Sequence, residues 1–540
     1  MKVLKFGGSS VGSPEAIEQV VDILEKRYRA GERFAVVFSA FSKVTDSLIE
    51  CAYRAASGDQ NWVTVFEKIK NRHFEAIEKL LKPEGREVAM AHISLNFNDL
   101  GDILHGVFLV KELSPRTLDM VVSFGERCSA YLLAQAMSQR GIPSAFLDAR
   151  SVVRTDEQFG SAKVDMAETE RLIQRHFSEN PQIQSITGFI GSTAPSPRGQ
   201  TTTLGRGGSD YTAAIFGAAL GAEAIEIWTD VDGVLTADPR RVKKAFSLPT
   251  MTYREAMEMS HFGAKVIYPP TILPALVRGI PLLIKNTFNP NHPGTLISDK
   301  AEPGDFPIKG ISSIGSVALV TLQGGGLAGV PGTAARLFGA LGRASVNVIL
   351  ITQGSSELNI TFAVLPNDWA AAKRAVESEF SREIEAGLVE PLKITGDHAV
   401  MAVVGEGMSH RPGVAGRIFT ALGKNGVNIA AIAQGSSELN VSLVIPSVDE
   451  TKALNAIHEA FFLSDTRVLN LFIVGAGLIG STLLEQIRRQ SDFLKEKRKL
   501  EIRVVGLANS TKMIFEENGI NLTDWKSQLV DNQSFTMPGF

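Results

Sequence analysis

Cysteine is scarce in this chain of 540 residues, which contains only Cys51 and Cys128. Two cysteines so far apart, without metal-ligand spacing, give no support for a disulfide framework, and we expect both to be reduced thiols packed in the core of a cytoplasmic protein. Long hydrophobic runs are missing too: none approaches the ~20 apolar residues of a membrane-spanning helix. The short apolar stretch in the first ten residues does not fit a secretory signal. We therefore expect no membrane association.

An excess of one charge is also absent. The 55 Lys and Arg residues nearly balance the 58 Asp and Glu residues, for a net charge of −3. The sequence therefore lacks the basic surface that is typical of proteins that bind nucleic acid. What is present is an ordinary globular composition, 44% hydrophobic and 21% charged, in a chain long enough for roughly three or four domains. Small molecules are the partners to expect.

The hydrophobic pattern divides the chain into three parts. Residues 1–300 alternate short apolar runs such as VLKF and FAVVFSA with helical patterns such as AIEQVVDILEKRYRA, which predicts an α/β domain around a mostly parallel sheet. The stretch SDKAEPGDFPIKG indicates a linker. Residues 310–465 contain a repeat, and residues 466–540 predict a strand, a glycine turn, a helix and a second strand, which is a partial Rossmann-type βαβ unit.

The repeat spans about 35 residues. The segment from Val330, VPGTAARLFGALGRASVNVILITQGSSELNITFAV, recurs 81 residues later from Arg411 as RPGVAGRIFTALGKNGVNIAAIAQGSSELNVSLVI. Each copy predicts an α+β module with a Pro-Gly entry, an amphipathic helix and strands. The shared polar string QGSSELN, which packing does not require, favours paired small-ligand sensors over a duplicated scaffold without a ligand.

Two glycine-rich strings in the first part stand between a strand and a helix. KFGGSS contains Lys5, Gly7, Gly8 and Ser9, and LGRGGSDYTAA contains Arg206, Ser209 and Asp210. Glycines let backbone N–H groups approach phosphate oxygens, and a helix N-terminus favours negative charge. An arginine at such a turn can bind a carboxylate or phosphate bidentately, and an aspartate there can cap the helix or hold a cation. Taken alone, KFGGSS also fits a tight strand-to-helix turn.

Further charged residues stand at expected strand and helix ends. IWTDVDGVLTADPR ends a strand with Thr229 and Asp230 and continues to Arg240, SFGER contains Glu126, and FGAKVIYP contains Lys265. Ligands of open α/β sheets bind at the carboxyl ends of the strands. Taken singly, each of these residues is more often a surface charge or a cap.

The motifs of the first part, taken in order, resemble those of the aspartate kinases in the amino acid kinase family. These motifs are KFGGSS, FSAFSKVTD, SFGER, LGRGGSDYTAA, WTDVDGV with ADPR, and GAKVIYP. The two repeats resemble that family's regulatory ACT modules, which are ferredoxin-like. With the glycine fingerprint added, nearly the entire chain resembles the bifunctional aspartokinase/homoserine dehydrogenase type. The resemblance implies phosphorylation of the β-carboxylate of L-aspartate by ATP and Mg²⁺, the first step towards threonine, methionine and lysine. It also implies a homo-oligomer, a dimer or a tetramer.

The resemblance implies a role for each residue of these strings. The phosphoryl group would be held by Lys5, Gly7, Gly8 and Ser9, and Asp210 would orient the catalytic centre. Aspartate would be bound by Ser39, Thr45, Glu126, Arg206 and Ser209. The nucleotide would face Thr229, Asp230, Arg240 and Lys265. Leu235 and Tyr268 depart from the commonest family pattern, which has a tyrosine and a histidine there, so the nucleotide contacts at these two positions stay open.

The chemistry of an amino acid substrate agrees with these roles. Arg206 would pair with its carboxylate and Glu126 with its ammonium group. The attacking β-carboxylate has a usual pKa near 3.9 and is already ionised at neutral pH, so no general base is required. The protein must supply alignment and positive charge for the phosphoryl group. An alternative function is an amino-acid sensor with an inactive kinase body, against which the intact Lys5, Arg206 and Asp210 argue.

The effector implied by the resemblance is threonine, with lysine as the second choice. Gln353 and Gln434 begin the two QGSSELN strings, and their amides can donate to and accept from a small hydroxylated amino acid. We expect them to be equivalent effector contacts.

The C-terminal glycines Gly475, Gly477 and Gly480 form a G-x-G-x-x-G string between a strand and a helix, as dinucleotide binding requires. The second strand, EIRVVGLANS, ends without an acidic residue for a ribose hydroxyl, and the nearby Lys512 favours NADP over NAD. Two strands and a helix cannot complete a doubly wound sheet of on the order of six strands. We therefore expect only a partial NADP site, at the start of a longer homoserine dehydrogenase domain, and no oxidation of homoserine by this chain.

Overall fold

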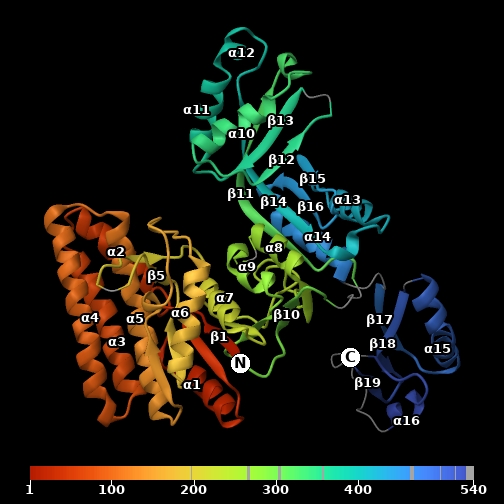
Figure 1. Cartoon of the computed structure of the whole chain (residues 1–540). Helices are drawn as coiled ribbons and strands as arrows, with labels where there is room; N and C mark the ends of the chain where they lie inside the picture. The colour runs from red at the N-terminus through yellow and green to blue at the C-terminus, as the bar shows by residue number, and fades with distance from the viewer. Residues whose placement is uncertain are drawn as a thin grey trace. The chain divides into compact units, whose positions relative to one another are not determined.

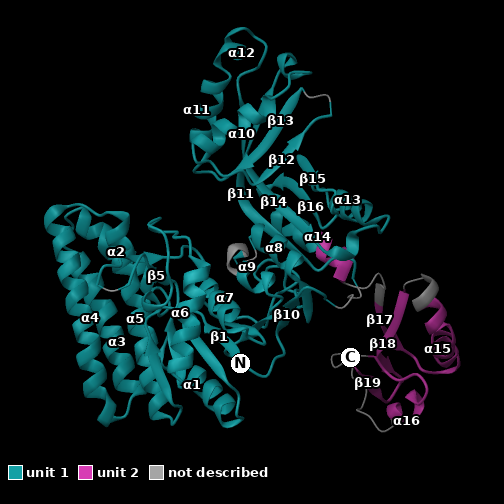
Figure 2. Ribbon diagram, in the orientation of Figure 1, with its two compact units in different colours: residues 1–455 teal, residues 456–540 magenta. Residues whose placement is uncertain are grey.

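The structure is a computed structural model that describes residues 1–195, 197–263, 268–301, 306–355, 358–462, 467–498, 500–516 and 519–530. The chain forms two compact units, residues 1–455 and 456–540 (Figure 2). The domain boundaries expected at residues 300, 310 and 465 stay predictions. Within the described residues, no helix combines the length and the apolar character needed to cross a membrane.

The first part of the chain, coloured red to yellow-green in Figure 1, is built around an eight-stranded sheet in the order β3-β4-β2-β1-β7-β9-β10-β8. All neighbouring strands are parallel except β9 and β10. All five residues of β2 are buried, which explains the unbroken apolar run FAVVF, because helices cover both faces of a parallel sheet. The strands are β1 (Lys2–Phe6), β2 (Phe34–Phe38), β3 (Ser144–Leu147), β4 (Ile183–Thr187), β7 (Ile225–Thr229), β8 (Thr250–Thr252), β9 (Leu282–Asn286) and β10 (Thr295–Ser298).

Helices pack against this sheet, and a small hairpin of β5 (Ile190–Ser192) and β6 (Thr201–Thr203) lies beside it. The first helix begins at Pro14, and the Ser13 side chain caps it by accepting a hydrogen bond from the Ala16 N–H at 3.3 Å. Proline at the first position and serine at the cap are the sequence signals of a helix start. The helices are α1 (Pro14–Arg29), α2 (Val44–Ala56), α3 (Trp62–Leu80), α4 (Pro83–Val110), α5 (Pro115–Gln139), α6 (Met166–Glu179), α7 (Gly208–Leu220), α8 (Tyr253–His261) and α9 (Pro269–Val277).

The two repeats share a single antiparallel sheet in the order β12-β13-β11-β14-β16-β15. Its centre is the long antiparallel pair β11 and β14, which runs from Gly310 opposite Val404 to Thr321 opposite Lys393, with register shifts on either side of Val317. Strand β13 pairs with residues 318–323 of β11, and β16 pairs with residues 398–404 of β14. Each repeat therefore supplies three strands to its own module. Its first strand, β11 in the first repeat and β14 in the second, is long enough that half of it also forms the fourth strand of the other module.

The strands of this sheet are β11 (Gly310–Gln323), β12 (Leu350–Gln353), β13 (Asn359–Val364), β14 (Lys393–Val404), β15 (Ala431–Gln434) and β16 (Asn440–Pro446). The helices of the repeats are α10 (Thr333–Arg343), α11 (Trp369–Glu379), α12 (Ser381–Glu385), α13 (Val414–Lys424) and α14 (Glu450–Phe462).

The C-terminal unit contains the expected strand, helix and parallel strand. Strands β17 (Arg467–Val474) and β18 (Leu500–Ala508) are parallel and flank α15 (Leu478–Arg498). Strand β19 (Met513–Phe515) then pairs antiparallel with β18, and α16 (Trp525–Val530) follows. A small apolar core that includes Leu484, Leu507 and Ile514 holds the unit together.

Candidate active site

Four parallel strands bring the glycine-rich and charged strings to one edge of the sheet. Strands β4, β2, β1 and β7 are neighbours, so their carboxyl ends meet. Backbone hydrogen bonds join the segments that follow them: the Ser39 N–H donates to the Phe6 carbonyl at 3.2 Å, and the Gly7 N–H donates to the Trp228 carbonyl at 3.1 Å. This is the edge at which ligands of open α/β sheets bind.

Lys5 and Asp210 form an ion pair at this edge. The Nζ of Lys5 lies 2.6 Å from Oδ1 of Asp210, and both side chains are largely buried. Helix α7 is capped by Gly207, so Asp210 lies in its first turn. The interpretation of Asp210 as the helix cap is therefore wrong. The pair places a lysine amine beside the N-terminus of a helix, where negative charge is favoured.

The KFGGSS turn packs tightly beside Lys5. A Cβ atom on Gly8 would lie 3.2 Å from the Ala40 carbonyl oxygen, and one on Gly7 would lie 3.3 Å from the Lys5 Nζ. Glycine therefore lets the backbone of this turn approach both the neighbouring loop and the lysine. Ser9 follows in the same turn, which closes with a hydrogen bond from the Ser10 N–H to the Gly7 carbonyl at 2.9 Å.

Glu126 on α5 is a buried carboxylate. It is 3% exposed, and among the described residues its Oε2 atom has no hydrogen-bond partner. Burial raises the pKa of Glu126 to about 8, although a hydrogen bond from the backbone of Ala40 acts in the opposite direction. A carboxylate left without a full set of partners in a buried position is suited to a cationic ligand group.

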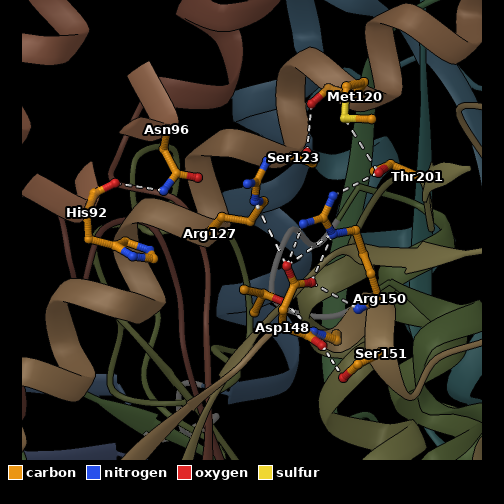
Figure 3. Close-up of polar contacts among 11 residues, drawn as sticks. His92, Asn96, Met120, Ser123, Arg127, Asp148, Arg150, Ser151 and Thr201 are labelled. Carbon is orange, nitrogen blue, oxygen red and sulfur yellow. Dashed lines mark hydrogen bonds and ion pairs between the residues drawn. The ribbon is translucent and has the colours of Figure 1, made fainter. Parts of the chain in front are cut away.

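The neighbouring Arg127 attaches the same helix to the segment that follows β3. Its guanidinium lies over the Phe124 ring at 4.2 Å, and its Nε lies 3.9 Å from Oδ2 of Asp148. Arg150 pairs with the same carboxylate at 2.6 Å and donates to Thr201 at 3.0 Å. Figure 3 shows the two guanidinium groups converging on Asp148. This cluster, which the sequence analysis did not identify, fixes α5 against the end of β3 and so fixes Glu126.

The other residues expected to bind aspartate lie on adjacent loops. Ser39 directly follows β2, and Thr45 lies in the first turn of α2. Ser209 is 9% exposed in the first turn of α7. Arg206 is exposed between two glycines of positive φ, and its guanidinium lies 5.7 Å from the centre of the Tyr268 ring.

A residue pair after β4 was missed by the sequence analysis. A Cβ atom on Gly188 would lie 2.6 Å from the Ser209 Oγ, and Phe189 has a φ of 70°, which is rare for a residue with a side chain. The Phe189 N–H donates to Thr212 Oγ1 at 3.0 Å. In the sequence, the glycine that follows the apolar strand in SITGF could have indicated a close backbone contact at this point.

The residues expected to face the nucleotide are only partly brought together. Thr229 ends β7, and its hydroxyl lies 3.1 Å from the Asp230 carboxylate. Arg240 is exposed and pairs with Asp238 at 2.7 Å. Lys265 lies outside the described residues. The part of the chain that the structure describes contains no cluster of acidic, histidine and cysteine side chains able to hold a metal ion.

A cavity of about 350 Å³ lies in the first repeat and includes Gln353. Gln353 ends β12, and the cavity is also lined by the entry to α10, from Gly329 to Ala334. Gln434 ends β15 at the equivalent position of the second repeat and is exposed. A larger cavity, about 620 Å³, is lined by residues at the amino ends of β2 and β4, the opposite edge of the sheet, and none of the predicted site residues lines it.

The C-terminal glycine string forms the turn between β17 and α15. Gly475 has a φ of 106°, its N–H donates to the Ala508 carbonyl at 2.8 Å, and a Cβ atom on Gly480 would lie 1.9 Å from the Gly475 carbonyl oxygen. Close packing of the helix on the strand therefore requires glycine at position 480. Gly477 lies at the start of the helix, where its carbonyl accepts from the Ser481 N–H at 2.8 Å.

The sequence matches the amino acid kinase family over residues 1–286 and the ACT domain twice, over residues 320–380 and 401–461. It is 30% identical to aspartokinase 1 of Arabidopsis thaliana, over 86% of this chain and 80% of that protein. The structure is similar to that of E. coli aspartokinase III in complex with aspartate and ADP, with a TM-score of 0.73, 30% identity, and coverage of 86% of this chain and 100% of the other. The chain therefore belongs to the amino acid kinase family and, within it, to the aspartokinases.

Longer relatives carry a second enzyme. Bifunctional aspartokinase/homoserine dehydrogenase 1 of Arabidopsis thaliana is 39% identical over 97% of this chain, which spans 58% of that protein. The bifunctional protein of Haemophilus influenzae is 37% identical over 98% of this chain, which spans 64% of it. These matches confirm the resemblance, the fold class of an amino acid kinase domain with ACT modules, and the similarity to the bifunctional type.

Proposed function

We propose that this chain transfers the γ-phosphoryl group of ATP to the β-carboxylate of L-aspartate. The observation that carries the proposal is the Lys5–Asp210 ion pair of 2.6 Å beside the KFGGSS turn. It is supported by the similarity to an aspartokinase whose structure contains aspartate and ADP. An ionised carboxylate needs no base to attack phosphorus, so the site has to align the reactants and offset their charge.

In this proposal each residue has one task. The amine of Lys5 and the N–H groups of Gly7, Gly8 and Ser9 stabilise the transferred phosphoryl group, and Asp210 holds the lysine in place. Glu126 receives the substrate ammonium, while Arg206 pairs with its α-carboxylate, and Ser39, Thr45 and Ser209 complete the aspartate pocket. Thr229, Asp230, Arg240 and Lys265 face the nucleotide.

Mg²⁺ fits this arrangement because it binds mainly through nucleotide phosphates and one or two carboxylates rather than through a protein cage. Asp210 is the carboxylate beside the KFGGSS turn. When bound, the ion would offset charge on the phosphates.

The proposal is tested by an amino-acid screen in a coupled assay of ADP release. We expect turnover with L-aspartate and ATP, and little with L-glutamate. Absence of turnover with every amino acid, in a chain that still binds an effector, would favour the sensor with an inactive kinase body.

We further propose that L-threonine inhibits the kinase through the two repeats. Gln353 lines the cavity of the first repeat, and the N-terminus of α10 in its wall would favour a carboxylate. The E. coli aspartokinase III structure with lysine and aspartate leaves lysine as the alternative effector. We expect threonine to inhibit wild type, and Q353A and Q434A each to weaken that inhibition, since such coupling is typically about 5- to 150-fold. A threonine response unchanged in Q353A and Q434A would remove these residues from the site.

A further inference from the structure

The second repeat contacts the first part of the chain at a loop that follows β7. This loop, residues 231–247, lies between Asp230 and β8 and contains Asp238, Arg240 and Arg241. Its backbone is tied to β11 by a hydrogen bond from the Ile311 N–H to the Thr236 carbonyl at 2.8 Å.

The loop is also attached to a buried carboxylate on the second repeat. Glu450 begins α14, is 3% exposed, and forms an ion pair with Arg241. Its other oxygen accepts a hydrogen bond from the Ser313 hydroxyl of β11 at 2.7 Å. Five residues further along α14, the Asn455 side chain donates to the Arg241 carbonyl at 3.0 Å. Both ends of Arg241, backbone and guanidinium, are therefore held by one helix.

The backbone of β11 makes room for this pair. A Cβ atom on Gly315 would lie 2.9 Å from Oε2 of Glu450 and 3.1 Å from a guanidinium nitrogen of Arg241. Three segments distant in sequence thus meet at one carboxylate, and glycine at position 315 lets them do so.

The first repeat does not have this carboxylate. Trp369 stands 81 residues before Glu450, at the equivalent position, and is 42% exposed at the start of α11. The ACT module therefore folds without an acidic residue at this point, and Glu450 is not explained by the needs of its own module.

A second contact joins the same repeat to α8. Asn440, the last residue of the second QGSSELN string, donates a hydrogen bond to the Glu258 carboxylate. The Glu406 N–H donates to Oε1 of Glu255, also on α8, at 2.9 Å. Helix α8 ends at His261, directly before the FGAKVIYP string. The second repeat thus holds both segments that lead into the expected nucleotide contacts.

We propose that Glu450 is a positioning residue for the nucleotide: by fixing Arg241, it holds the 231–247 loop so that Asp230 and Arg240 present a formed nucleotide surface. The proposal rests on the proposed function for the assignment of these two residues to the nucleotide. It places α14 of the second repeat, together with the first half of β11, in direct contact with the nucleotide side of the site.

The experiment compares E450Q with wild type and with E377Q. Glu377 lies on α11 of the first repeat and pairs with Lys373 of its own helix at 3.8 Å, so E377Q removes a carboxylate without touching the loop. Amide hydrogen exchange of residues 231–247 is measured in the chain without ligand. We expect exchange on the order of tenfold faster in E450Q, because local opening follows the loss of tertiary contacts, and unchanged exchange in E377Q.

Titration with MgADP and steady-state kinetics provide the second readout. We expect the Kd for ADP and the KM for ATP to rise roughly five- to tenfold in E450Q, with the KM for aspartate within about twofold of wild type. R241Q should raise the same two constants by a similar factor. In the double variant E450Q/R241Q the increase should be close to that of either single variant, because the two residues act as a pair.

Unchanged loop exchange and unchanged ADP affinity in E450Q would overturn the proposal. If E450Q unfolds at a lower temperature than wild type, R241Q replaces it, since it removes the guanidinium that pairs with Glu450 and leaves the hydrogen bond from Ser313 to Glu450 in place, and the same two results decide. A wild-type chain that does not phosphorylate aspartate would refute the proposed function instead, and the exchange result would still stand or fall by itself.

Discussion

At the scale of single residues, the candidate site is defined by charges that are buried and incompletely paired. Lys5 and Asp210 bind each other at 2.6 Å, whereas Glu126 retains an oxygen without a partner in the described residues. In the proposed function, Lys5, held by Asp210, supplies the positive charge for a phosphoryl group, and Glu126 receives the substrate ammonium group.

We expect K5A and D210A each to lower kcat for aspartate phosphorylation by about 10²- to 10³-fold, because each removes a group that stabilises or positions charge at the reacting centre. K2A is the matched control: Lys2 lies at the other end of the same strand and pairs with Glu32 at 3.0 Å. Circular dichroism should show an intact fold in all three variants. A near-normal kcat in K5A would contradict the mechanism.

The raised pKa of Glu126, about 8 against a usual 4.5, predicts a pH dependence of stability. The native state retains a proton that the unfolded chain has released, so this residue costs stability increasingly as the pH rises from 4.5 to 8. Relative to E126Q, we expect the free energy of unfolding of wild type to fall by up to about 1.4 kcal/mol per pH unit within that window. Denaturant unfolding at several pH values measures it, and parallel curves for the two proteins would refute the assignment.

At the scale of secondary-structure elements, close helix contacts determine where site residues lie. Helix α5 approaches the loop after β2 at Gly125, where a Cβ atom would lie 2.8 Å from the Ala40 Cβ. The Arg127–Asp148–Arg150 cluster holds the same helix from its other side. Glu126 is therefore positioned by its neighbours on the helix.

We expect G125A to push α5 away from this loop and to raise the KM for aspartate roughly tenfold, since small displacements of binding groups weaken a positioned site. G106A is the control: Gly106 lies inside α4, and its added Cβ would meet nothing within 4 Å. That substitution should leave the kinetics unchanged and stabilise the helix by up to about 1 kcal/mol. Equal KM values in both variants would show that the contact at Gly125 is unimportant.

At the scale of the whole molecule, the chain combines a kinase with a paired regulatory sheet and a C-terminal βαβ unit. The second and first repeats exchange halves of their long strands, so a change in one module has a direct route to the other. The chain spans only about 58 to 64% of the bifunctional relatives that it matches.

We expect the 540-residue chain to release ADP with aspartate but to form no NADPH from homoserine. The described part of residues 456–540 contains three strands, fewer than the on the order of six that a doubly wound dinucleotide-binding sheet requires. Absorbance at the nicotinamide wavelength measures the second reaction, with a full-length bifunctional relative as positive control. Homoserine-dependent turnover by this chain would contradict the expectation.

The sequence by itself determined the features that depend on neighbouring residues. The apolar run of β2, the glycine strings at Gly8 and Gly480 and the repeat 81 residues apart are all local patterns. Together with the ordered motifs from KFGGSS to GAKVIYP, they indicated the family and the parallel sheet. Local patterns have this power because the period of burial and the sterics of a turn are set within a few residues.

Only the tertiary structure decided which distant residues meet. Lys5 reaches Asp210 because the strand order places α7 beside β1. The guanidinium of Arg127 lies near the Asp148 carboxylate instead of pointing into solvent. Glu450 pairs with Arg241, which is more than two hundred residues away in the sequence. None of these pairs can be predicted from the local sequence around either residue, since the same charged residue occurs on a helix whether its side chain faces water or an ion-pair partner. The register of β11 on β14 is likewise set by contacts between the repeats, and it joins two similar modules into one sheet.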